Sequence, residues 1–161
     1  MAKEVIRIDD RDFLRLLKSL PPELVSKRGG PVLAGLRRGG NVIRKSWRAE
    51  IQRIIDEPNI GGEYRSTGTY AKAIKVTRMR RPERVGANEA VRVTVPARAT
   101  YPDGTKVALV AGVLEIGRED MQAKAPMRNA FERSKGEALA AILKGIDAGI
   151  QRAIKKLDKT A

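Results

Sequence analysis

Residues 31–55 read PVLAGLRRGGNVIRKSWRAEIQRII, and their apolar positions recur with the period of an α-helix. The apolar side chains step by three and four positions along this stretch; they are Val32, Leu36, Ile43, Trp47, Ile51 and Ile54. The opposite face is basic and carries Arg37, Arg38, Arg44, Lys45, Arg48 and Arg53. Pro31 suits the first turn of a helix, where a backbone N–H is not needed. The pattern predicts one long amphipathic helix.

Two glycines and the only tryptophan of the chain lie on this helix. Gly39 and Gly40 each cost about 1 kcal/mol relative to alanine. They either let another backbone approach closely or mark a kink, and the sequence leaves both open, although Gly40 fills the missing place in the apolar stripe. Trp47 lies on that stripe, which favours core packing. An anchor at a subunit interface is the alternative.

Two further helices flank this one in the sequence. Asp9 or Asp10 starts a short N-terminal helix, which Pro21 and Pro22 end. From Pro126 a helical pattern runs nearly to the end of the chain. Its apolar positions are Met127, Phe131, Ala138, Ile142, Ile146, Ile150, Ile154 and Leu157.

The segment between the long helices has strand and turn patterns. A strand is expected around Lys75–Met79, and Ala90–Ala97 alternates valines with polar residues, as a half-buried strand does. Tyr101–Lys106 predicts a turn, and the apolar run Lys106–Gly117 predicts a strand inside the sheet. The fold class is therefore α+β: an antiparallel sheet of about four strands packed against two long helices, with a short N-terminal helix. Residues 1–161 form one domain, with 1–8 and 158–161 as loosely ordered tails.

The composition is strongly basic. The 33 lysines and arginines exceed the 19 acidic residues and give a formal net charge of +14. Such a charge favours an acidic partner, either nucleic acid or an acidic protein surface. The alternative is a basic surface that only keeps the protein in solution.

The residues available for catalysis are few. Histidine and cysteine are absent, which removes the commonest general base, the best nucleophile and the usual zinc ligands. No run of about 20 apolar residues could span a bilayer, and the N-terminal MAKEVIRIDD lacks the apolar core of a secretory signal. We therefore expect a structural protein rather than an enzyme, made in the cytoplasm, with no cofactor, metal or membrane partner.

Four sequence strings, taken in order, resemble the tail-completion or head–tail joining (neck) proteins of long-tailed bacteriophages with non-contractile tails. Residues 20–51 resemble the opening pair of helices of that family, and STGTYAKAIKV (66–76) resembles its Thr-Gly approach to the first strand. VLEIG (113–117) resembles a strand end, and APMRNAF (125–131) resembles the start of the C-terminal helix. Together these strings span most of the chain from Leu20 to Leu157.

The resemblance implies a structural virion protein of the phage neck. Subunits of this family form a ring, usually of six, at the top of the tail. The implied partners are further copies of the chain, the head-side connector or stopper protein, the tail tube or terminator protein, and the double-stranded DNA in the lumen. No catalytic residue or cofactor is implied.

Two sets of residues are candidates for these contacts. The first is a basic loop that faces DNA or an acidic partner, with a merely solvated loop as the alternative; its residues are Lys75, Arg78, Arg80, Arg81 and Arg84. The second is a subunit interface with a glutamate–arginine pair across the ring; its residues are Glu115, Arg118 and Trp47. Aromatic residues are only 4% of the chain, so base stacking is not expected.

Two other functions stay open at this point. A basic nucleic-acid-binding accessory protein is supported by net charge alone. A tail terminator of the same assembly fits the resemblance nearly as well as a tail-completion protein.

Overall fold

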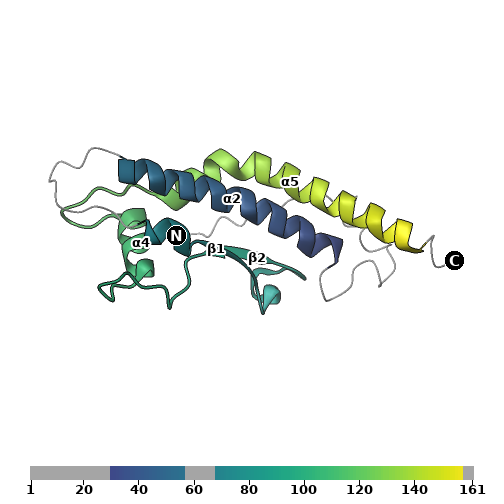
Figure 1. Cartoon of the computed structure of the whole chain (residues 1–161), viewed down its shortest axis with the longest axis horizontal. Coiled ribbons are helices and arrows are strands. Elements are labelled where there is room, and N and C mark those ends of the chain that lie inside the picture. The colour runs from purple at the N-terminus through teal and green to yellow at the C-terminus, as the bar shows by residue number, and fades with distance from the viewer. Residues whose placement is uncertain (1–29, 57–67, 158–161) are drawn as a thin grey trace.

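The structure, a computed structural model, describes residues 30–56 and 68–157 (Figure 1). The short N-terminal helix predicted at Asp9 or Asp10 lies outside these ranges, as do the predicted tails at 1–8 and 158–161.

Two long antiparallel helices, α2 (Pro31–Asp56) and α5 (Pro126–Leu157), form one side of the molecule (Figure 1). Each starts with a proline, in the position where its missing N–H costs least. The start of α2 lies against Gly149 near the end of α5. Further along, the hydroxyl of Ser46 donates a hydrogen bond of 3.0 Å to the carbonyl of Ala130. Both helices therefore begin where the sequence places them.

The glycines of α2 allow two close approaches and produce no break in the helix. A Cβ on Gly39 would lie 2.8 Å from the carbonyl oxygen of Ala138 in α5. A Cβ on Gly40 would lie 2.8 Å from a methyl group of Val76, on the other side of α2. Of the two alternatives that the sequence leaves open, close approach is the one observed.

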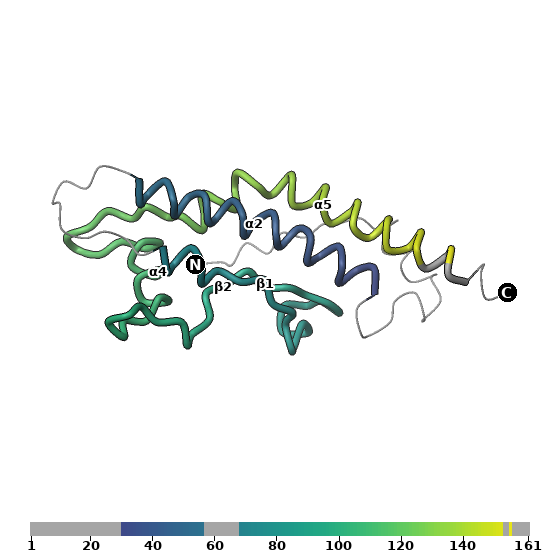
Figure 2. The backbone as a smooth tube through the Cα atoms, viewed as in Figure 1, coloured from purple at the N-terminus to yellow at the C-terminus, as the bar shows by residue number. Residues whose placement is uncertain are grey.

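A two-stranded antiparallel hairpin packs on the side of α2 opposite α5. Strand β1 (Lys75–Arg78) pairs with β2 (Val91–Thr94), with Val76 opposite Val93 and Thr77 opposite Arg92. Both strands contact α2 and neither contacts α5, so α2 is the middle of three layers (Figures 1 and 2). A short 3-10 helix, η1 (Pro82–Val85), lies in the loop that joins the strands.

The segment predicted as an interior strand is a helix instead. Helix α4 (Val107–Ile116) occupies most of the apolar run from Lys106 to Gly117. The run is apolar at nearly every position and therefore shows neither the period of a strand nor that of a helix. Its ten residues exceed the usual strand length, and Ala108, Ala111 and Leu114 favour a helix. A helix also satisfies its own backbone hydrogen bonds, which a strand beside this small sheet would have to share with a neighbour.

The predicted architecture needs a corresponding correction. A mixture of helices with an antiparallel sheet is present, as expected for α+β. The sheet of about four strands covered by two long helices is wrong. Within 30–56 and 68–157 the sheet has two strands, four α-helices are present, and only α2 of the long helices lies on the sheet.

The main core lies where α2, α4 and α5 meet the short helix α3 (Thr69–Ala73). Its buried residues are Trp47, Ile51, Tyr70, Ile74, Val107 and Ala130. Arg48 fixes α3 on α2, because its guanidinium donates to the carbonyls of Ala71 at 2.9 Å and of Ile74 at 3.2 Å. These carbonyls at the end of a helix have no partner within it, so a cation there is favourable.

None of the helices within the described ranges combines the length and the apolar character that a bilayer crossing requires.

Candidate partner-binding surfaces

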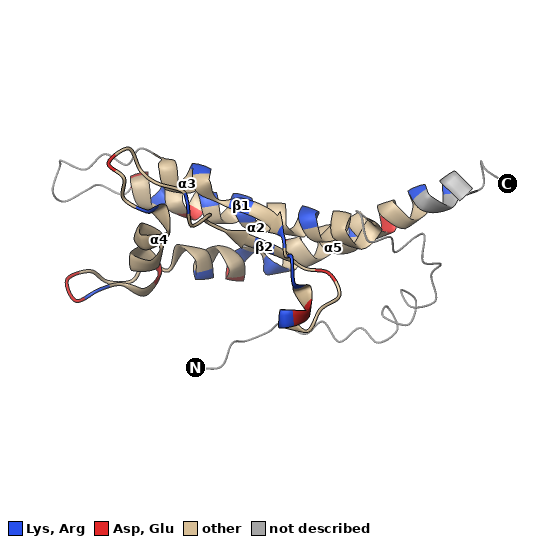
Figure 3. Ribbon diagram, turned by 90° about the horizontal axis from the view of Figure 1, so that it is seen from below, with Lys and Arg blue, Asp and Glu red and all other residues tan. Residues whose placement is uncertain are grey.

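The face of the hairpin that points away from α2 is basic. Because side chains alternate along a strand, Val76 and Val93 face α2, whereas Lys75 and Arg92 point outward and are exposed. Lys72 and Arg98 lie next to this face, where they help to line a depression of about 410 Å³. Its lining residues are Thr69, Lys72, Ala73, Lys75, Pro96, Arg98 and Ala99. Figure 3 views the molecule from this side, with lysine and arginine in blue.

No carboxylate in the described part of the chain lies within ion-pair distance of these four cations, Lys72, Lys75, Arg92 and Arg98, which we call the basic face. Lys72, Lys75 and Arg98 line the depression, and Arg92 lies further along the same face of the hairpin. Exposed cations arranged in this way can bind successive phosphates of a nucleic acid or carboxylates of a protein. The basic face is therefore a candidate site for an anionic partner.

The structure separates the members of the predicted basic loop. Lys75 belongs to the basic face, but Arg78 is bound by Glu89, with Nε 3.0 Å from Oε2 and Nη2 in contact with Oε1. Arg80, Arg81 and Arg84 lie in the loop around η1, beyond the far end of the hairpin, and all three are exposed. They form a second basic surface, which we call the hairpin tip, together with the half-exposed Val85.

Three residues of the basic face were missed by the sequence interpretation. Lys72 lies in α3 and Arg98 follows β2, so neither belongs to a charge run. The position of Arg92 could have been inferred from the sequence, because it alternates with valines whose side chains are half-buried against α2. Its place opposite Thr77, on the same face as Lys75, depends on the register of the hairpin, which the sequence alone does not give.

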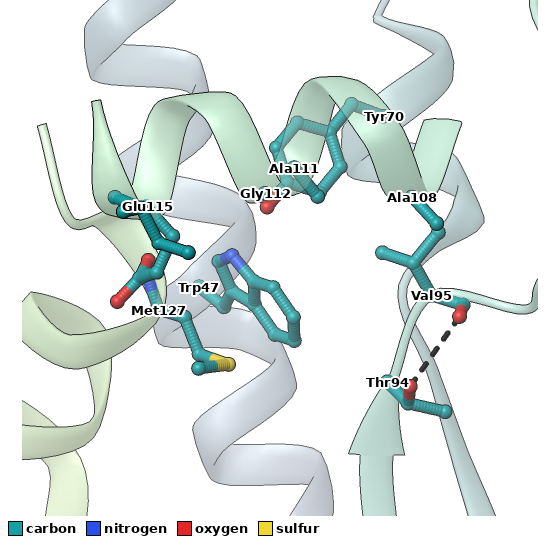
Figure 4. A pocket seen from close by; sticks show the side chains of 10 residues that line it. Trp47, Tyr70, Thr94, Val95, Ala108, Ala111, Gly112, Glu115 and Met127 are labelled. Atoms are coloured by element: carbon teal, nitrogen blue, oxygen red, sulfur yellow. Dashed lines mark hydrogen bonds between the residues drawn. The ribbon is translucent and has the colours of Figure 1, made fainter. Parts of the chain in front are cut away.

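A pocket of about 260 Å³ opens between α4, the start of α5 and the end of β2 (Figure 4). One face of α4 supplies half of its lining through positions 108, 111, 112, 115 and 116, which is helical spacing. The full set of lining residues is Trp47, Tyr70, Thr94, Val95, Ala108, Ala111, Gly112, Glu115, Ile116 and Met127. The pocket is therefore mainly apolar, with one carboxylate.

Two buried aromatic residues form one wall of the pocket. The rings of Trp47 and Tyr70 meet edge to face, with centroids 6.1 Å apart and planes at 85°. Their polar atoms, the indole Nε1 and the phenol oxygen, face each other (Figure 4), and neither makes a hydrogen bond of good geometry. Trp47 is 4% and Tyr70 is 3% exposed, so these polar groups are buried without full satisfaction. Trp47 is thus a core residue that also faces the pocket.

Burial raises the pKa of Tyr70 to about 12; the indole N–H of Trp47 lowers this pKa in part, and the charge of Glu115 raises it further. The folded-state pKa lies above the ordinary value of 10.0, so the unfolded chain ionises first as the pH rises. The stability that the folded protein owes to the neutral Tyr70 is therefore fully present below pH 10 and is lost as the pH approaches 12. We expect the urea-unfolding free energy of the wild type to fall over this window more steeply than that of Tyr70→Phe. Parallel curves for the two proteins would contradict the assignment.

Glu115 stabilises the start of α5. Its two carboxylate oxygens accept hydrogen bonds from the backbone N–H groups of Met127, at 2.8 Å, and Arg128, at 3.1 Å. The loop between α4 and α5 holds the start of α5 next to Glu115, because the carbonyl of Leu114 accepts hydrogen bonds from the N–H groups of both Lys124 and Ala125 at 3.0 Å. The carboxylate thus lies at the positive end of the α5 dipole.

The glutamate–arginine pair is predicted between two subunits, and it stays a prediction. Within the chain, Arg118 binds Asp120 in the exposed turn after α4, with 2.7 Å between Nη2 and Oδ2. This contact raises the pKa of Arg118 and lowers that of Asp120. Glu115 was placed in a strand by the sequence interpretation, and the helix gives it a different role, as a cap.

Replacing Glu115 with alanine should lower the free energy of unfolding by about 1–2 kcal/mol, because two N–H groups at the start of α5 lose their acceptor. Glu115→Gln keeps one acceptor oxygen and should cost less. Urea unfolding followed by circular dichroism measures both. An alanine variant as stable as the wild type would show that water replaces the carboxylate at no cost.

Large apolar side chains remain exposed around the pocket. Ile116 is 81% and Met127 is 45% exposed, and both line it; Leu109, on the same helix, is 64% exposed. A pocket with such a rim can take an apolar side chain from another protein.

Comparison of the chain with protein-family models, with curated proteins and with solved structures gives no significant match.

Proposed function

We propose that this chain is a structural subunit of a bacteriophage neck, a tail-completion protein that forms a ring at the top of the tail. In this role it joins the tail to the head-side connector and surrounds the DNA channel. The observation that carries the proposal is the presence of two separate exposed surfaces, an apolar pocket on α4 and a basic face on the hairpin. A ring subunit at a DNA channel needs surfaces of both kinds, one for protein and one for an anionic partner.

The resemblance of the sequence strings to the neck family adds to this argument. It supplies the ring, usually of six subunits, and the partners on either side: the connector or stopper toward the head and the tube or terminator toward the tail. The two-helix layer of α2 and α5 gives the hairpin and α4 a rigid support, because its glycines pack the helices tightly. Surfaces held on such a support keep their geometry during assembly.

Sedimentation of the purified protein, alone and mixed with purified tail tubes, tests the proposal. We expect co-sedimentation with tubes or a ring of hexamer size. A monomer that ignores tubes at low and at moderate salt would overturn the neck assignment.

A basic nucleic-acid-binding accessory protein is the second candidate, favoured by the four cations of the basic face. If these cations bind phosphates, Arg92→Ala should lower the slope of log affinity against log salt concentration by about 1. The same holds for Lys75→Ala. Lys144→Ala, an exposed cation on α5 and away from the hairpin, is the matched control. Fluorescence anisotropy with labelled duplex DNA measures the slopes, and equal slopes for all variants would exclude the basic face as the binding site.

The tail-terminator role belongs to the same assembly and uses the same kinds of surface. It predicts binding to the end of the tail tube without binding to the head connector. Sedimentation with connector particles separates this role from tail completion.

A further inference from the structure

The large apolar side chains that the fold leaves exposed are concentrated at two places on the hairpin side of the molecule. Leu109, Ile116 and Met127 lie on or beside the pocket of Trp47 and Tyr70, and Val85 lies at the hairpin tip, 50% exposed. Among the described residues one more such side chain, Leu143, lies apart on α5. One place is a cavity and the other is a projecting side chain.

The pocket and the hairpin tip lie at opposite ends of the hairpin. Thr94 and Val95, at the end of β2, line the pocket, whereas η1 joins the end of β1 to the start of β2. Strands of four residues span about 13 Å. Figure 1 shows α4 and η1 separated by the length of the sheet. The Val85 side chain therefore does not reach the pocket of its own chain, and contact between the two places needs a second copy.

The charges of the two places are opposite. The hairpin tip carries three exposed arginines, Arg80, Arg81 and Arg84, against one exposed glutamate, Glu83. The pocket is bordered by the turn after α4, where the exposed Glu119 and Asp120 outnumber Arg118, the ion-pair partner of Asp120. Such complementarity orients two surfaces and excludes the contact of each with itself.

We infer that the hairpin tip of one copy docks into the Trp47–Tyr70 pocket of a second copy, with Val85 as the apolar anchor and Arg81 and Arg84 toward Glu119 and Asp120. The two surfaces differ, so the contact is head to tail, and its repetition closes a ring or continues as a filament. The choice of a second copy as the occupant rests on the proposed function. The two surfaces themselves come from the structure.

Two variants block one surface each and leave the other intact. Val85→Asp places a charge on the anchor. Gly112→Leu fills the pocket, because a Cβ at Gly112 meets nothing within 4 Å and leucine is a good helix former. Gly136→Leu is the matched control, since Gly136 is equally open and lies on α5. Circular dichroism melts confirm that each variant is folded.

Sedimentation velocity of these full-length proteins, over a range of concentrations at low salt, tests the contact. We expect the wild type and Gly136→Leu to self-associate, and each blocking variant alone to show a dissociation constant raised about tenfold or more. An equimolar mixture of Val85→Asp and Gly112→Leu should form dimers and nothing larger, because one intact tip meets one intact pocket. The emission of Trp47, the only tryptophan, should change on mixing.

Three results would overturn the contact: a wild type that stays monomeric, a blocking variant that associates like the wild type, or a mixture that stays monomeric. Loss of association in Gly112→Leu alone, with Val85→Asp unaffected, would indicate a symmetric contact between two α4 helices instead. Binding to tail tubes is measured separately. If the protein fails to bind tubes while the mixture still forms dimers, the neck assignment is overturned and the contact stands. If both blocking variants still form rings on tubes, the contact is overturned and the neck assignment stands.

Discussion

Gly145→Leu should lower the free energy of unfolding by about 3 kcal/mol, although leucine is a better helix former than glycine. A Cβ on Gly145 would lie 2.7 Å from the Cα of Gly35 in α2. The obstacle is backbone, which a change of rotamer cannot relieve. The side chain therefore pushes α2 and α5 apart and loosens the contacts on either side of the crossing.

Gly136→Leu is the matched control for this prediction as well. It lies on the same helix, and a Cβ there meets nothing within 4 Å. We expect the control to be stabilised by up to about 1 kcal/mol through helix propensity. Urea unfolding followed by circular dichroism measures the free energy of unfolding of both variants. We expect it to fall for Gly145→Leu and to rise for Gly136→Leu. Equal effects would mean that α2 and α5 are not in close contact.

Trp47→Ala should cost about 3–5 kcal/mol, because it removes the largest side chain of the core and leaves a cavity beside Tyr70. Trp47→Phe keeps an aromatic ring in the same place and should cost less. Urea unfolding followed by far-ultraviolet circular dichroism measures both, since the fluorophore is lost.

This experiment also separates the two roles that the sequence allows for Trp47. A core residue lowers the stability of the monomer when it is truncated. If Trp47→Ala unfolded at the same urea concentration as the wild type and only failed to associate, the tryptophan would be an interface anchor alone.

The long helices are the part of the fold that the sequence predicts best. In α2 the apolar stripe that includes Trp47 and Ile51 repeats over many turns, and in α5 the pattern begins at a proline. Long periodic segments contain enough positions for the period to be unambiguous. The strand at Lys75–Arg78 and the strand at Val91–Thr94 are also confirmed, within the wider ranges expected for them.

Helix α4 could not be assigned by the same reasoning. A run such as VALVAGVLEI is apolar at nearly every position, so its period gives no information. Its length was the available signal, since ten residues are more typical of a helix than of a strand. Because the sequence predicts a strand here, it places Glu115 at a strand end and does not predict that this residue caps α5.

The candidate surfaces were predicted only in part for a related reason. The charge run from Lys75 to Arg84 is visible in the sequence, but its members lie at the two ends of the hairpin. The partners of Arg78 and Arg48 depend on contacts across the fold, with Glu89 and with the carbonyls of α3. Local patterns do not contain such contacts.

The position of α2 between the hairpin and α5 has a consequence for how the chain folds during synthesis. Ser46 and Ala130, which meet across the two helices, are 84 residues apart in sequence. When α2 leaves the ribosome its longest neighbour has not yet been made, and its closely packed glycines have nothing to meet. The hairpin can form early because its strands are close in sequence, but the helix pair closes only after α5 has been made. Until α5 is made, the nascent chain therefore exposes the side of its central helix that α5 covers in the folded protein.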